Sequence, residues 1–137
     1  MLDRFLRRER EEGIDHPRAV CALLVAAARA DGVFEADEAR AVVGLVADQF
    51  DLGPEETAAL VTAVAGEEQL DLYPVTRWLV DNLEIEARAE VVGQMWRVMF
   101  SDGRLEARED ALMHRVGKLL QISHRDLMAL KLSIRPR

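Results

Sequence analysis

The sequence is poor in the residues that would indicate a β-rich protein. Of its 137 residues, eight are glycine, three are threonine and one is tyrosine. Alanine and leucine, which favour helices, are abundant. No segment alternates between apolar and polar residues as a half-buried strand does. We therefore expect an all-α protein.

Cysteine is nearly absent too. The one cysteine, Cys21, cannot form an internal disulfide, and we expect it to pack in the core as a small apolar residue. It lies in a run of ten residues without a charge, residues 19–28, and no uncharged run in the sequence is longer. Since a membrane-spanning helix needs about 20 apolar residues, this run is too short to be one. The charged N-terminus shows no signal peptide, so we expect a cytoplasmic protein.

The charge is acidic overall but unevenly distributed. The net charge is −7, yet residues 31–86 carry fourteen acidic and two basic residues, whereas residues 87–137 carry six acidic and ten basic ones. An acidic middle disfavours nucleic acid as a partner and suits a cation or a basic protein partner. A merely solvated acidic surface explains it equally well.

Apolar residues at helical spacing predict seven or eight helices in a single domain over residues 13–137. The clearest segments run over approximately residues 17–31, 35–50, 54–66, 73–83, 85–100 and 106–120, and Ser123 caps a last helix after them. The first of these is apolar on nearly every side, so we expect it at the buried centre.

Residues 1–12 form a separate charged helix or tail. Leu2, Phe5 and Leu6 are spaced as one helical stripe, and four arginines lie among them and just after them. The stripe suits docking on the domain. A weak contact of residues 1–10 with a membrane surface is the other reading.

The most specific signal is an internal repeat. Residues 31–38 read Asp-Gly-Val-Phe-Glu-Ala-Asp-Glu, and residues 102–109 read Asp-Gly-Arg-Leu-Glu-Ala-Arg-Glu. Each copy follows one predicted helix and precedes another. We therefore predict an internal pseudo-twofold duplication of two three-helix units.

The repeated acids suggest a metal site. If the pseudo-twofold axis brings the two loops together, their first and last carboxylates converge, and a divalent cation would relieve the repulsion between them. Carboxylate oxygens prefer Ca²⁺ or Mg²⁺, without excluding Zn²⁺ or Mn²⁺. The predicted ligands are Asp31, Glu38, Asp102 and Glu109.

Helix capping explains the same residues without a metal. Glu35 and Glu38, like Glu106 and Glu109, have the spacing of a capping box, in which the later side chain bonds back to the helix start. A complete EF-hand is not predicted, because apolar or basic residues occupy its first ligand positions.

These motifs resemble the TerB-like family, which is named for a tellurite-resistance protein and is related to the N-terminal domain of membrane-anchored co-chaperones. The resemblance covers approximately residues 16–132 and rests on both Asp-Gly-x5-Glu loops, on Asp71-Leu72-Tyr73 and on Ile122-Ser123. It implies an all-α, internally duplicated domain whose acidic residues bind metal and which acts in bacterial stress responses.

Three functions follow as expectations. The first is a stress-response module that binds a divalent cation and a protein partner. The second is a metal-free interaction scaffold that uses the acidic surface. The third is nucleic-acid binding through the helix-turn-helix-like residues 116–133, which the acidic net charge disfavours.

We do not expect an enzyme. No serine lies in a recognisable nucleophile setting, because a helix cap explains Ser123 beside His124. His114 lies one helical turn from Asp110, which predicts a surface pair rather than a zinc site.

Overall fold

The computed structural model describes residues 14–30, 32, 34–102 and 107–134. The predicted helix or tail at residues 1–12 lies outside these residues. Within them are seven α-helices, one 3-10 turn and no strand, so the all-α prediction is confirmed. The elements are α2 (His16–Ala28), α3 (Ala36–Phe50), α4 (Pro54–Ala65), α5 (Leu72–Asn82), α6 (Ile85–Met99), η1 (Phe100–Asp102), α7 (Ala107–Leu119) and α8 (His124–Ile134).

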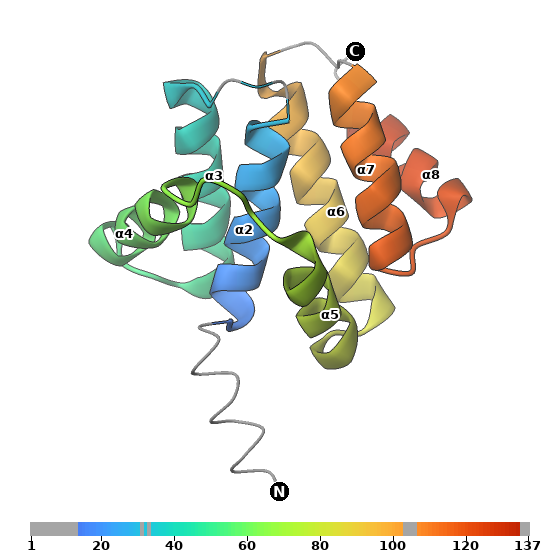
Figure 1. Ribbon diagram of the computed structural model, residues 1–137, viewed down its shortest axis with the longest axis horizontal. Coiled ribbons are helices and arrows are strands. Elements are labelled where there is room, and N and C mark those ends of the chain that lie inside the picture. The colour runs from blue at the N-terminus through green and yellow to red at the C-terminus, as the bar shows by residue number, and fades with distance from the viewer. Residues whose placement is uncertain (1–13, 31, 33, 103–106, 135–137) are drawn as a thin grey trace, which may run out of the picture.

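Helix α2 is the centre of the fold, as its apolar sequence predicts. It packs against α3, α4, α5 and α6, and nine of its thirteen residues are buried (Figure 1). Cys21 is among the fully buried residues, as expected. Asp15 caps the helix by accepting a hydrogen bond of 2.9 Å from the Arg18 backbone N–H. An element buried on all sides has no room for charged side chains, which explains the uncharged run.

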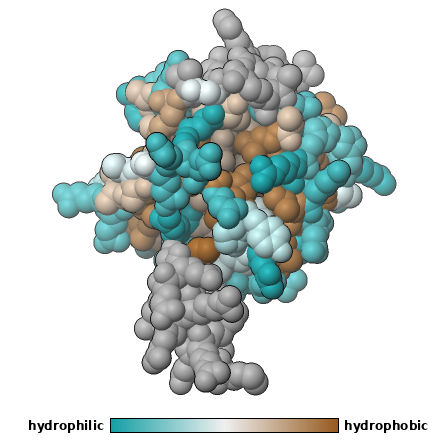
Figure 2. Space-filling view, viewed as in Figure 1, coloured by the Kyte–Doolittle hydropathy of each residue, from teal (hydrophilic) through white to brown (hydrophobic). Residues whose placement is uncertain are grey.

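Helix α6 carries the second half of the core. It packs against both α2 and α8, and it buries the fully enclosed Trp96 together with Met95 and Val98. In Figure 2, hydrophilic residues cover much of the viewed face, and hydrophobic residues show between them near its middle. The amphipathic helices thus bury one side each and leave the other to water.

Most helix boundaries lie within one residue of the sequence-based ranges, and the end of α2 differs most. Helix α5 begins at Leu72, because Asp71 caps it by accepting a hydrogen bond from the Tyr73 N–H at 3.1 Å. Pro74 then lies in the first turn, where a missing N–H costs no helical hydrogen bond. Helix α2 ends at Ala28, and Arg29 is its C-cap.

The last helix begins where the sequence predicts. Ser123 is its cap, and its hydroxyl accepts a hydrogen bond of 3.1 Å from the Asp126 N–H. In the turn before it, Gln121 has a φ of 59°.

The order of elements is compatible with the predicted repeat. A three-helix run, α2 to α4, and a second, α6 to α8, lie on either side of α5 along the chain. Helices α2 and α6 are packed neighbours and begin at the same end of the molecule (Figure 1). The internal duplication itself stays a prediction.

Candidate functional site

The first Asp-Gly loop joins α2 to α3 through a turn that needs glycine. Gly32 has a φ of 91°, and its N–H donates to the Arg29 carbonyl at 2.9 Å. Side chains other than glycine rarely adopt this φ, because the Cβ atom would crowd the backbone. The loop therefore reverses the chain at the position that the sequence predicts. Asp31, the first predicted ligand, lies outside the described residues.

Glu38, the second predicted ligand, lies in the first turn of α3. Its carboxylate accepts a hydrogen bond of 3.2 Å from the Glu35 backbone N–H, and the Glu35 side chain completes the capping box. The capping interpretation is therefore confirmed for this residue. Glu38 is nevertheless only 5% exposed, which is unusual for a glutamate that merely caps a helix.

The second loop joins α6 to α7 through η1. Asp102 ends this 3-10 turn, but its side chain lies outside the described residues. Glu109 lies in the first turn of α7 and is 3% exposed. The two glutamates that close the repeated motif are thus buried at equivalent places, each as the third residue of its helix, α3 or α7.

The two loops lie at the same end of the molecule. In Figure 1, α2 and α6 both end at the top and α3 and α7 both begin there, and α3 packs directly against η1. The fold therefore gathers the two halves of the motif at one end. Among the described side chains, three His, Cys, Asp or Glu residues do not come together as a metal site. The side chains of Asp31 and Asp102 lie outside those that the structure describes.

The helix N-termini and burial have opposite effects on the ionised carboxylates at this end of the fold. A helix N-terminus carries a partial positive charge, which favours carboxylates in the first turn. Burial of a carboxylate, however, costs free energy unless hydrogen bonds or a counter-charge compensate for it. The capping box supplies one such hydrogen bond to Glu38. Both glutamates are hard oxygen donors, and both already lie almost entirely out of water.

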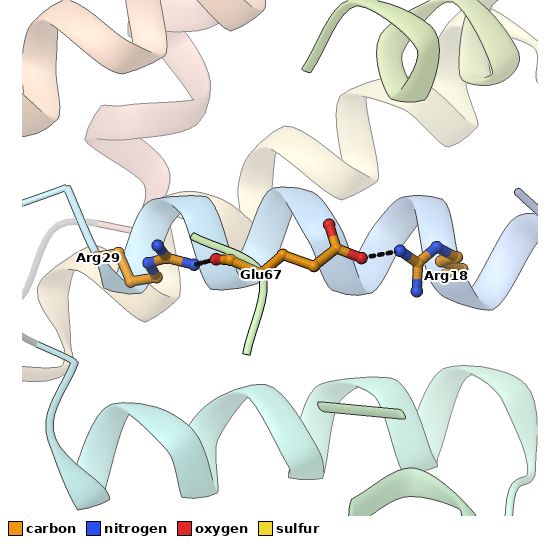
Figure 3. Close-up of polar contacts among 3 residues, drawn as sticks. All are labelled: Arg18, Arg29 and Glu67. Carbon is orange, nitrogen blue, oxygen red and sulfur yellow. Dashed lines mark hydrogen bonds and ion pairs between the residues drawn. The ribbon is translucent and has the colours of Figure 1, made fainter. Parts of the chain in front are cut away.

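Arg29 anchors the first loop to a distant part of the chain. Its guanidinium donates to the backbone carbonyls of Glu67 and Glu68, each at 3.0 Å. The Glu67 carboxylate in turn pairs with Arg18 on α2, so both ends of α2 hold the α4–α5 connection (Figure 3). The sequence offered no signal for this cluster, because its members are separated by 38 to 49 residues.

A second polar cluster lies between α7 and α8. Asp110 lies 3.3 Å from His114 Nε2, which confirms the predicted surface pair, and 3.1 Å from Lys131 Nζ. The His114 ring stacks on His124, with ring centroids 5.0 Å apart. Lys131 also lies 5.4 Å from the centre of the Trp96 ring. Sequence spacing identified the first pair and missed Lys131 and His124, which only the packing of α8 brings near.

Comparison with known protein families finds one family that matches this chain. A family described as tellurite resistance protein TerB matches residues 17–132, which is most of the chain. The chain belongs to the TerB family. No curated protein and no solved structure matched it. The match covers both Asp-Gly loops of this TerB domain and all seven of its described helices except part of the first and the last.

Several predictions concern the membrane and the binding partners of the TerB domain. No described helix is long and apolar enough to cross a membrane. The expected relation to membrane-anchored co-chaperones stays a prediction, and so do the protein partner and the absence of nucleic-acid binding.

Proposed function

We propose that this TerB-domain protein is a non-enzymatic, cytoplasmic module of a tellurite-resistance-type stress response that binds a divalent cation at its paired loops. The observation that supports this is the burial of Glu38 and Glu109 at one end of the fold, each seven residues after the aspartate of its motif. Asp31 and Asp102 complete the proposed ligand set. Four carboxylates that converge repel one another, and a bound cation would relieve that repulsion.

The donors fit a hard cation. All four proposed ligands are carboxylates, which bind Ca²⁺ and Mg²⁺ in preference to softer metals. A carboxylate has two oxygens and about four lone pairs, so one such group can accept a hydrogen bond and coordinate a cation at the same time. The cation would link α3 to α7, and its chemistry would be electrostatic and structural rather than catalytic.

Thermal unfolding tests the proposal. The full chain is stripped with EDTA and melted alone and with Ca²⁺, Mg²⁺, Mn²⁺ or Zn²⁺. A ligand at about 100 times its Kd adds about 2.7 kcal/mol to the free energy of unfolding. For a domain of this size we expect the midpoint to rise by roughly 5–10 °C.

Matched variants locate the effect. Glu38→Gln removes a charge but keeps an oxygen that can accept the Glu35 hydrogen bond, and Glu109→Gln makes the same change in the second loop. Asp37→Asn is the control, because Asp37 is 81% exposed and pairs with Arg40. We expect the midpoint shift to be lost in both glutamine variants and kept in the control. A wild-type protein that no ion stabilises would leave these glutamates as helix caps.

The metal-free scaffold is the second candidate. Acidic residues at and after the start of α4, namely Glu55, Glu56, Glu68 and Asp71, are exposed, so they are available to a basic protein partner. If no ion shifts the midpoint, this acidic surface becomes the functional feature to test, by loss of partner binding in Glu55→Lys/Glu56→Lys.

A further inference from the structure

A groove between α6 and α8 shares no lining residue with the paired loops and has no role in the proposed cation site. Two adjoining hollows of about 470 and 500 Å³ share the lining residues Glu86, Ala89, Leu130 and Ser133, so they form one continuous groove. Hollows of this size fall within the range of about 300–1,000 Å³ typical of binding pockets.

The floor of the groove is apolar and made partly of small side chains. Ala89 of α6 and Ala129 of α8 line it, with Ile85 and Ile122 at one end. Ile85 is 41% exposed, which is unusual for a large aliphatic residue in this molecule. At Gly93 the two helices come close, since a Cβ atom there would lie 3.3 Å from Ile134 Cδ1. Small residues open room above them for larger apolar side chains from another segment.

The rim of the groove is acidic. Glu86, Glu90 and Asp126 line it against one basic residue, Arg97. An occupant that matches both features has an apolar stripe flanked by basic residues, which is how an amphipathic helix binds in a groove.

The first eight residues of the same chain have this chemistry. Leu2, Phe5 and Leu6 form an apolar stripe at helical spacing, and residues 1–8 carry three arginines against one aspartate. We propose that this N-terminal stripe binds in the α6–α8 groove of its own chain, with its arginines toward the acidic rim.

The length of the chain permits this contact. Helices α2 and α6 are packed neighbours and begin at the same end of the molecule, so the described chain starts near the Ile85 end of the groove (Figure 1). Packed helices are about 8–10 Å apart. Residues 9–13 span up to about 17 Å when extended, which is enough to pass from α2 across α6.

Limited digestion of the full chain with trypsin tests the proposal, with the cuts after Arg7 and Arg8 followed by mass spectrometry. Cleavage follows the population in which the stripe has left the groove. We expect Ala129→Glu, which places a charge on the exposed floor, to speed these cuts about tenfold, as a loss of 1.4 kcal/mol would. Phe5→Asp should do the same, and the double variant should be no faster than either single one.

One control variant and one rim variant make the result specific. Ala58→Glu adds the same charge at an exposed position of α4 and should not change the rate. Glu86→Lys reverses a rim charge without touching the floor and should accelerate cleavage, and circular dichroism should show each variant folded. Rates that are equal in wild type, Ala129→Glu and Glu86→Lys would overturn the proposal.

Two further measurements distinguish the proposed contact from binding of the segment to a second copy or to a membrane. Protection that increases with protein concentration would place the segment in the groove of a second copy and overturn the intrachain contact. Binding of the full chain to phosphatidylserine vesicles that is equal in wild type and Ala129→Glu, with cleavage also unchanged, would assign the stripe to a membrane surface instead.

Discussion

Shortening one leucine at the centre of α2 tests the architecture most directly. Leu24 is fully buried, and α2 is packed by four other helices. Leu24→Ala removes apolar atoms from a site that the neighbouring helices cannot easily fill. The loss therefore includes both the transfer free energy of the deleted atoms and the cost of the remaining cavity.

The expected size follows from this burial. Fully buried Leu→Ala substitutions cost about 2–5 kcal/mol, and a site surrounded on all sides should lie in the upper half of that range. For a domain of this length, a loss of about 3.5–5 kcal/mol lowers the thermal midpoint by roughly 15 °C. Leu132→Ala is the matched control, because Leu132 is 67% exposed on α8. The same chemical change there should alter the free energy of unfolding by less than about 0.5 kcal/mol.

Equilibrium unfolding in urea measures both variants. Far-ultraviolet circular dichroism reports the helices, and fluorescence of the buried Trp96 and the half-buried Trp78 reports packing. Coincident transitions indicate two-state unfolding, which the comparison requires. An unchanged slope with a lower midpoint for Leu24→Ala assigns the loss to stability. Equal losses at Leu24 and Leu132 would refute the central position of α2.

Three further outcomes follow from particular residues. Burial raises the pKa of the Cys21 thiol to about 12, so a thiol reagent at pH 8 should leave the native protein unmodified and react only after unfolding, as mass spectrometry would show. Burial lowers the pKa of His16 below 6.5, although the nearby Asp15 opposes this shift. Because the folded protein favours the neutral ring, the stability that His16 contributes is complete above pH 6.5 and is lost as the pH falls. His16→Phe should weaken this loss of stability, as thermal melts at two pH values would show. Gly32→Ala forces a side chain into a φ of 91° and should lower the free energy of unfolding by about 1–2 kcal/mol. Gly44→Ala, at an open mid-helix position, should raise the free energy of unfolding by about 0.5–1 kcal/mol. Equal effects of the two variants in urea unfolding would contradict the turn geometry.

The sequence predicted the helices well because their signals are local. The uncharged run of α2, Pro17 and Pro54 near helix starts, and Ser123 before α8 each act within one or two turns of the chain. The same holds for the Glu35–Glu38 capping box and for the turn at Gly32, which the structure confirms. These features need no knowledge of distant residues.

Tertiary structure alone decided which distant groups meet. Arg29 reaches the carbonyls of Glu67 and Glu68, and Lys131 reaches Asp110, through helix packing that no spacing along the chain encodes. The burial of Glu38 and Glu109 also depends on the helices around them. Hydrophobic periodicity determines which face of a helix is buried, but it does not determine which helix covers that face. The repeated acidic motif was therefore readable from the sequence, while its gathering at one end of the TerB domain is a property of the folded chain.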